Sequence, residues 1–416
     1  MEAFVGRDPP FRICHLLRAS GFSDVTRITT LQSGISQPEV TIPGCRTLSR
    51  VTTLAPPFCA YSDALESVAP HEQQTFDDIA HIMRHIAELI GDRARHTTRP
   101  VHAKSHGLLK AELAIASGLP EHLSQGLFSK PALYPAIMRF STNPGDILPD
   151  SISTPRGLAV KVIGVEGEML PGHEGNVTQD FVFVNGKAFP AADAAAFLKQ
   201  IKFLEQHVTD SQTLKQIVST TARLAEETLE AFGAHSGALL GFGHPETHIL
   251  GETFTSVAAL RYGAYVAKIA FVPASNNLKA LGHKKLDHGS DHSALRDSII
   301  KFFEAETAVW DVQVQMMADP SKTPVEDASV EWPEDVSPYT TVGTLTAVPQ
   351  AAYSAERRVY VDEILSFSPW QGLKDHRPLG SIMRARKSAY IIGSKYRHST
   401  EGRPSGEPKS IGELPD

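Results

Sequence analysis

Two histidines four residues apart are the first side chains in this sequence that could do chemistry. They are His102 and His106, in the stretch RPVHAKSHG. On a helix this spacing would let both bind zinc, but zinc proteases also need a glutamate after the first histidine, and Ala103 stands there. Pro100 and Gly107 favour a loop or strand end, where the spacing does not align two side chains. A metal shared by the two histidines is therefore disfavoured. Two interpretations stay open: one histidine is a proton-handling base, or both are ordinary surface residues.

A second candidate is an anion site near the strand-like stretch MRFST. Arg139 lies in this stretch, Ser141 follows two residues later, and Arg156 stands at a turn in TPRG. Arginine binds carboxylates through two parallel hydrogen bonds, so these residues could hold an anionic group. Both arginines could equally form surface ion pairs.

A third candidate is Asn176, which follows a glycine in EGNVTQDFVFV. An asparagine in this position is typical of a turn. Its functional alternative is a neutral hydrogen-bond donor in a pocket walled by Phe181 or Phe189.

The stretch RARKSAY places Arg386 four residues before Tyr390, and on a helix the two share a face. A guanidinium beside a phenol stabilises the phenolate, which is a ligand for ferric iron in some haem proteins. The ordinary alternative is a tyrosine packed under the arginine stem.

Taken together and in this order, these stretches resemble the catalase family, over roughly residues 55–400. RPVHAKSHG is similar to the family segment R-x-V-H-A-K-G, MRFST to VRFST, and PRGLAVKV to PRGFAVKF. GNVTQDFVFV is similar to GNNTPIFFI, and IMRARKSAYIIGSKYRH to MLQARLFAYPDTHRHR. Each motif alone is weak, but several motifs in one order are specific.

The resemblance implies a haem site with these residues in defined roles. His102 would be the distal acid and base, Ser141 would fix its tautomer, and Asn176 would hydrogen-bond the peroxide. Tyr390 would bind the haem iron, with Arg386 as its partner. The other implied haem-binding residues are Arg99, Arg139 and Arg397 for the propionates, with Val101, Phe181 and Phe189 as pocket walls; His106 would have no role.

Within the family, the chain is more similar to the shorter, catalase-related haem peroxidases than to full-length catalases. The stretches LRYGAYVAKIAFVPAS, TPVEDASVEWPEDVSPY and PWQGLKDHRPLGSIMRARK carry this likeness. The sequence stops soon after Tyr390, so we expect neither the C-terminal helical region of full catalases nor bound NADPH. The expected cofactor is haem, of b type.

We therefore expect a peroxidase acting on hydrogen peroxide and organic hydroperoxides, with an organic electron donor and residual catalase activity. Catalase proper and a non-catalytic haem-binding protein are the alternatives. The allene oxide synthase branch is disfavoured, because it has a threonine where Val101 stands. A haem-free β-barrel that binds another ligand also remains open.

Composition excludes several other classes. The 416 residues carry a net charge of −7 without a long basic run, which argues against nucleic acid as a partner. The three cysteines are Cys14, Cys45 and Cys59, and they show no CxxC spacing, so a reducing, cytoplasmic location is expected. Neither a signal peptide nor an apolar stretch long enough to cross a membrane is evident. A homo-oligomer is left open, as is whether Met1 is the true start.

The elements that must position these residues form segregated helical and strand-like blocks. QQTFDDIAHIMRHIAELIGDRAR has apolar residues at helical spacing, as do residues 190–232 and the last block up to about residue 400. AIMRFST, GLAVKVIGV, DFVFVN, GAYVAKIAFVPA, WDVQVQMMA and TVGTLTAV are of strand length and type. This segregation predicts an α+β fold with a catalase-like antiparallel β-barrel and flanking helices. The predicted divisions are an irregular N-terminal arm (1–55), a haem-binding domain (56–400) and a disordered tail (401–416).

Overall fold

The computed structural model describes residues 58–207, apart from 144, 146 and 151–153, and residues 247–416, apart from 283 and 287–291. All of them belong to one compact unit, Pro56–Asp416. The irregular arm expected for residues 1–55 lies outside the described residues.

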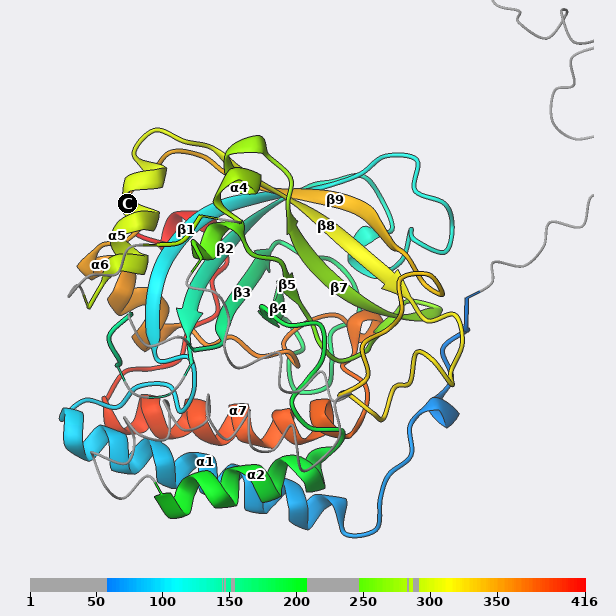
Figure 1. Ribbon diagram of the computed structural model, residues 1–416, viewed down its shortest axis with the longest axis horizontal. Helices are drawn as coiled ribbons and strands as arrows, with labels where there is room; N and C mark the ends of the chain where they lie inside the picture. Colours follow the sequence, from blue (N-terminus) through cyan, green and yellow to red (C-terminus); the bar gives the residue numbers. More distant parts are fainter. Residues whose placement is uncertain are drawn as a thin grey trace, which may run out of the picture. The chain divides into compact units, whose positions relative to one another are not determined.

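The core of this unit is an antiparallel β-barrel (Figure 1). In the described part of the chain, nine strands form one sheet in the order β5-β4-β3-β2-β1-β9-β8-β7-β6. β5 also pairs with β7, which closes the sheet on itself. The strands are β1 (Lys104–Ile115), β2 (Leu133–Thr142), β3 (Arg156–Ile163), β4 (Thr178–Val184), β5 (Phe254–Thr255), β6 (Leu260–Tyr262), β7 (Tyr265–Pro273), β8 (Ala308–Met316) and β9 (Tyr339–Ala347).

The two faces of the barrel wall bury different residues, because side chains alternate along a strand. Met138 and Phe140 of β2 belong to the main hydrophobic cluster, which fills the barrel. Ile137 of the same strand belongs to a second cluster that also contains Val361 and Leu414. The outer face of β2–β4 is therefore covered by the chain around residue 361 and by the C-terminal segment. Arg139 and Ser141 have the parity of Ile137 and so lie on this outer face.

Three helices form a layer below the barrel in the view of Figure 1. They are α1 (Glu72–Ala94), α2 (Ala194–His207) and α7 (Ser381–Thr400). Apolar side chains from all three helices join in one cluster, which holds the layer together. The other helical elements are α4 (Asn276–Leu281), α5 (Ala294–Phe303), α6 (Ala355–Arg358), the π-helical turn η6 (Val359–Ile364), and the 3₁₀ turns η2 (Asp63–Leu65), η3 (Gly126–Phe128), η5 (Ile249–Gly251), η7 (Lys374–His376) and η8 (Ile411–Glu413).

The α+β barrel and its flanking helices are as the sequence predicted, and the predicted strands and the helices α1 and α7 are confirmed. The long strand β1 was not predicted. It begins with Lys104, Ser105 and His106, whose polar side chains are buried here, and this pattern does not look like a strand in the sequence. α2 confirms the start of the helical stretch expected over residues 190–232; its part beyond residue 207 lies outside the described residues.

Residues 401–416, expected to be disordered, instead pack against the barrel. Leu414 is fully buried, and the Glu407 carboxylate accepts hydrogen bonds from Lys161 Nζ at 2.7 Å and Thr178 Oγ1 at 2.9 Å. Arg357 Nε donates to the carbonyl of Pro415 at 2.8 Å. The Pro- and Gly-rich composition suggested disorder because it does not reveal that these few side chains have buried partners.

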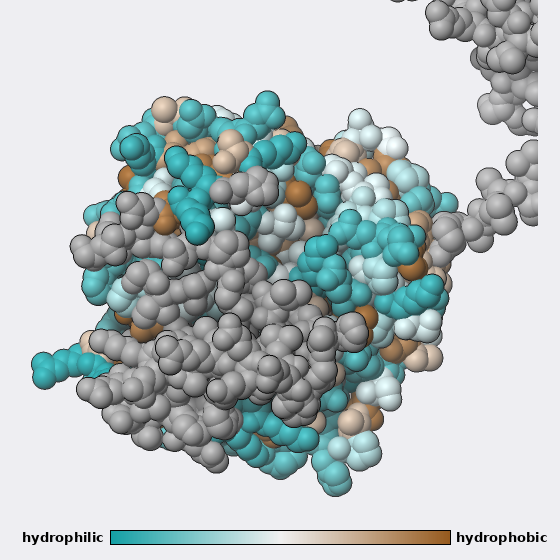
Figure 2. All heavy atoms as spheres, in the orientation of Figure 1, coloured by the Kyte–Doolittle hydropathy of each residue, from teal (hydrophilic) through white to brown (hydrophobic). Residues whose placement is uncertain are grey.

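The surface of the described residues mixes hydrophilic and hydrophobic side chains. On the face drawn in Figure 2, the hydrophobic side chains are scattered outside the grey atoms. Large exposed hydrophobic side chains such as Val68, Leu133 and Val348 lie far apart in the sequence. Within the described ranges, no helix combines the length and the apolar character needed to cross a membrane.

Candidate active site

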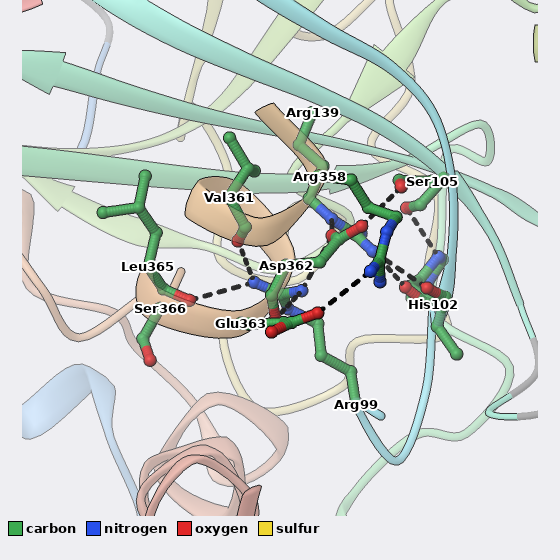
Figure 3. A network of polar contacts seen from close by, with 12 residues as sticks. Arg99, His102, Ser105, Arg139, Arg358, Val361, Asp362, Glu363, Leu365 and Ser366 are labelled. Carbon is green, nitrogen blue, oxygen red and sulfur yellow. Dashed lines mark hydrogen bonds and ion pairs between the residues drawn. The ribbon is translucent and has the colours of Figure 1, made fainter. Parts of the chain in front are cut away.

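The loop between α1 and β1 brings His102 to the outer face of the barrel. Ser141 Oγ lies 3.3 Å from Nδ1 of His102, and Arg139 Nη2 donates to the His102 carbonyl at 2.8 Å (Figure 3). The backbone of His102 has a φ of 53°, a left-handed conformation that is uncommon for residues other than glycine. Arg139 therefore helps hold the histidine in an unusual conformation that turns its ring toward Ser141.

Gly157 of β3 makes room for the His102 ring. A Cβ atom at Gly157 would lie 2.6 Å from Nδ1 of His102 and 3.0 Å from Ser141 Oγ, closer than real Cβ contacts allow. Gly157 is paired with Ser141 across the β2–β3 ladder, so both strands contribute to one side of the imidazole. Any side chain at this position would displace the ring from Ser141.

The environment of His102 keeps its imidazole neutral. Burial lowers the pKa of His102 to about 3, with further lowering by the positive charges of Arg139 and Arg386. A neutral imidazole has one nitrogen that can accept a proton. If Nδ1–H donates to Ser141, that nitrogen is Nε2, as an acid–base catalyst requires.

Beside His102, Arg99 and Arg139 converge on Asp362 of the turn η6 (Figure 3). Arg99 Nη1 and Arg139 Nε donate to Asp362 Oδ1 at 2.9 and 2.7 Å, and Ser105 Oγ donates to Oδ2 at 2.6 Å. Burial would raise the pKa of Asp362, but Arg139 and Arg99 lower it more, so its net shift is downward. Asp362 is therefore a carboxylate that stays ionised inside the protein.

Arg397 of α7 reaches the same turn from the other side. Its Nη1 donates to the Asp362 carbonyl at 2.5 Å and to the Glu363 carbonyl at 2.9 Å. The Leu365 carbonyl accepts from Nη2 of both Arg397 and Arg99. Burial lowers the pKa of Arg397 to about 10. Burial also lowers the pKa of Arg99, and the positive charges of Arg139 and Arg397 lower it further.

This arginine cluster (Arg99, Arg139 and Arg397) carries more positive charge than its contacts neutralise. Asp362 is the carboxylate that pairs with it, while the Glu363 carboxylate pairs with Arg358 at 3.1 Å and Arg403 at 2.6 Å. Three guanidinium groups and one carboxylate leave two positive charges in a buried site. Buried charge is costly without a counter-charge, so the cluster suits a ligand with two negative charges.

α7 presents Met383, Arg386, Tyr390, Gly393 and Arg397 at alternating spacings of three and four residues, which places them on one face. Arg386 Nη2 donates to Tyr390 Oη at 2.7 Å. A Cβ at Gly393 would lie 3.2 Å from Pro100 Cγ, so the loop that carries His102 packs closely on this face of α7. Tyr390, His102 and the arginine cluster thus belong to one region.

Asn176 lies just before β4, near the end of the β3–β4 ladder where Thr178 pairs with Ile163. Gly157, beside His102, pairs with Val184 at the other end, about 20 Å away along the strand at roughly 3.3 Å per residue. Asn176 Nδ2 donates to Gln371 Oε1 at 3.3 Å. That Asn176 shares a pocket with His102 stays a prediction.

Phe181 belongs to the barrel-filling cluster, where it stacks on Phe183 with ring centroids 6.0 Å apart. His102 lies on the outer face of the wall, so the place of Phe181 in its pocket stays a prediction. Residue-by-residue alignment of a short motif cannot reveal which face of a strand each residue occupies.

The other two expected pocket residues remain near the site. Val101 is half-buried next to His102. Phe189 packs on Phe197 with ring centroids 5.3 Å apart and joins the cluster of Met383, which lies on the same face of α7 as Tyr390.

His106, the second histidine of the opening motif, is a buried structural residue. Its ring is fully enclosed, and Nε2 lies 2.9 Å from Thr142 Oγ1. Among the described residues, no three His, Cys, Asp or Glu side chains gather in a way that could hold a metal ion.

Sequence reasoning missed Asp362, Ser105 and Gly157. Asp362 lies in VYVDEIL, where two adjacent carboxylates among apolar residues were a signal that could have been used. Ser105 and Gly157 lie inside motifs that were singled out, but their roles depend on the pairing of strands and on the position of His102, which motifs do not specify.

Comparison with known proteins places these features in context. A family model for Catalase matches residues 63–356, a range that includes His102, Arg139 and Ser141 but ends before Asp362 and α7. A search of curated proteins finds no match.

Among solved structures, a bacterial catalase is similar with a TM-score of 0.50 and 19% identity, over 79% of this chain and 64% of that one. A fungal catalase is similar with a TM-score of 0.50 and 16% identity, over 88% and 71%. Catalase A from Saccharomyces cerevisiae has a TM-score of 0.49 and 16% identity, over 83% and 68%. At these identities the first two matches show a common fold. This chain spans less than two thirds of the bacterial protein.

Proposed function

Because the chain belongs to the catalase family, we propose that it is a haem-dependent peroxidase that reduces hydrogen peroxide and organic hydroperoxides. In this proposal an organic electron donor supplies the electrons, and catalase activity accompanies the peroxidase reaction. The observation that carries the proposal is the gathering of His102, the arginine cluster and the Arg386–Tyr390 pair in one region.

The residues of this region fit a haem group. The two positive charges that Asp362 leaves unneutralised in the arginine cluster match the two propionates of a b-type haem. Tyr390 would bind the iron through its phenol oxygen, which accepts a hydrogen bond from Arg386. When bound, haem supplies a redox-active iron at which the oxygen–oxygen bond of a peroxide can be cleaved.

His102 would move the proton in this reaction. Its neutral imidazole takes a proton from one peroxide oxygen and returns it to the other, so that the departing oxygen leaves as water or as an alcohol. Ser141 holds Nδ1 and thereby keeps Nε2 as the accepting atom. Gly157 and the Arg139 hydrogen bond to the His102 backbone keep the ring in place.

The balance between the two activities would depend on Asn176, whose amide donates to Gln371 Oε1 in this structure. If Asn176 does not reach a peroxide held by His102, peroxide as the second substrate would lack one hydrogen-bond donor, which would favour a peroxidase over an efficient catalase. Catalase proper is the second candidate, favoured by the family match.

The proposal is tested by titrating the protein with haem and then measuring oxygen release and phenol oxidation on addition of hydrogen peroxide. Donor oxidation with little oxygen would support a peroxidase, and oxygen release independent of the donor would support catalase. A His102→Gln variant should bind haem equally and lose both activities. A protein that binds haem but consumes no peroxide would overturn the proposal.

A further inference from the structure

Trp370 occupies an unusual position relative to the candidate site. The chain has three tryptophans, and Trp310 and Trp332 are fully buried with 0% and 1% of their surface exposed. Trp370 is the partly exposed one of the three. Its indole Nε1 donates to the Met383 carbonyl of α7 at 2.7 Å, which fixes the ring against that helix.

A continuous series of contacts leads from Trp370 to Tyr390. Met383, which accepts the indole hydrogen bond through its carbonyl, contacts Arg386 Nη1 through its sulfur at 3.3 Å. Arg386 Nη2 then donates to Tyr390 Oη at 2.7 Å. The series therefore passes through three residues of one face of α7.

We propose that Trp370 is a surface site at which an organic donor, of the phenol class, is oxidised without entering the interior. The inference rests on the proposed function, since the oxidising equivalents come from peroxide reduced beside Tyr390. The indole of tryptophan, the thioether of methionine and the phenol of tyrosine are the side chains in this series that can lose an electron. The partly exposed indole is the one that a large donor can touch.

The electrons balance as follows. Hydrogen peroxide takes two electrons and two protons and becomes two molecules of water. Trp370 loses one electron toward Tyr390 and then regains one from a phenol in solution. That phenol releases its hydroxyl proton and becomes a phenoxyl radical. Two phenols are oxidised for each peroxide, and the indole ends unchanged.

Lys387 provides a control within the structure. Its ammonium lies 4.9 Å from the centre of the Trp370 ring, on the next turn of α7 after Met383, and the residue is exposed. A cation over an aromatic face disfavours loss of an electron from that ring. Lys387 thus restrains the oxidation of Trp370, and its removal should make the indole a better relay.

The test uses the haem-loaded full chain and two donors, a small free phenol and a phenol coupled to a soluble polymer. Trp370→Phe should lower oxidation of the polymer-bound phenol by about tenfold or more, with peroxide consumption and the free phenol changed less than about twofold. Trp332→Phe, which removes a buried tryptophan, should leave both donors unaffected. Lys387→Gln should raise polymer oxidation by about two- to fivefold, whereas Lys395→Gln on the same helix should not.

A second readout does not depend on oxidation of a donor. After peroxide is added without donor, peptide mass spectrometry should find added oxygen on Trp370 before Trp310 or Trp332, and the polymer-bound phenol should suppress it. If wild type and Trp370→Phe oxidise both donors equally and Trp370 stays unmodified, the relay is wrong while the proposed function stands. If wild type oxidises neither donor and consumes no peroxide, both fail.

Discussion

Asp362 should be the most sensitive single position of the arginine cluster. Its carboxylate accepts hydrogen bonds from Arg99, Arg139 and Ser105 at 2.6–2.9 Å. Asp362→Asn keeps the size of the side chain but removes the charge that offsets one of three buried guanidinium groups. It also replaces the oxygen that accepts from Ser105 with an NH₂ group, so the Ser105 hydroxyl would have to become the acceptor.

The size of the effect follows from these contacts. Arg99 and Asp362 expose 15% and 14% of their side chains, and Arg139 exposes 3%, so solvent screens the pairs poorly. Breaking a buried ion pair by removing one partner costs about 3–5 kcal/mol. We therefore expect Asp362→Asn to lower the free energy of unfolding of the haem-free protein by about 3–5 kcal/mol.

The effect should depend on pH in a defined direction. The pKa of Asp362 is lower in the folded protein than its ordinary value, since Arg139 and Arg99 outweigh the opposing effect of burial. Such a group stabilises the fold above its unfolded pKa of about 3.9, and the stabilisation is lost as the pH falls through its folded pKa. The difference between wild type and Asp362→Asn should thus be full at neutral pH and shrink below about pH 4.

The assay is urea unfolding of haem-free wild type and variant at pH 7 and at the lowest pH where both are folded. Asp92→Asn, at an exposed aspartate of α1, is the control and should change the unfolding free energy by less than about 0.5 kcal/mol. An Asp362→Asn effect no larger than that of the control would refute the idea that Asp362 neutralises the cluster. So would an effect that grows as the pH falls.

Three further predictions concern the histidine and the C-terminal segment. Gly157→Ala should displace His102 and reduce peroxide turnover by on the order of 10²–10⁴-fold while the haem spectrum is retained. Normal turnover would show that the His102 ring does not need the space left by the missing Cβ of Gly157. The pKa of His102 is lowered to about 3, so the imidazole stays neutral at higher pH and kcat/KM should be level between pH 5 and 8. A drop in the kcat/KM of wild type as the pH falls through about 6.5 would contradict the low pKa. Leu414→Ala should lower the free energy of unfolding by about 2–5 kcal/mol, measured by thermal or urea unfolding, because this side chain is fully buried. A change below about 0.5 kcal/mol would mean that the C-terminal segment does not pack on the barrel in solution.

The sequence was informative where local patterns decide the structure. Periodic apolar residues predicted α1 and α7, and β-branched runs predicted the strands that flank the site. The same periodicity placed Arg386 and Tyr390 on one face, and the structure joins them by a hydrogen bond. β1 was missed because its first residues are polar but buried, and burial depends on tertiary contacts rather than on local pattern.

The site was predictable only in part, for the same physical reason. The motifs named His102, Ser141 and the arginine cluster, which do lie in one region. They could not set where Asn176 and Phe181 lie relative to His102, because the position along a strand and the face of the sheet follow from strand register. The partners of Asp362 could not be named from the sequence, since they lie more than 200 residues away in the chain and meet it only at the turn η6.

The central claim, that this region holds haem with Tyr390 as the iron ligand, is tested most directly by absorption spectroscopy. Wild type and Tyr390→Phe should be titrated with ferric haem, with Tyr396→Phe as a control on the same helix. We expect a high-spin ferric Soret band in wild type and Tyr396→Phe, and a shifted or absent band in Tyr390→Phe. A band that is unchanged in Tyr390→Phe, or no band in wild type, would contradict the account.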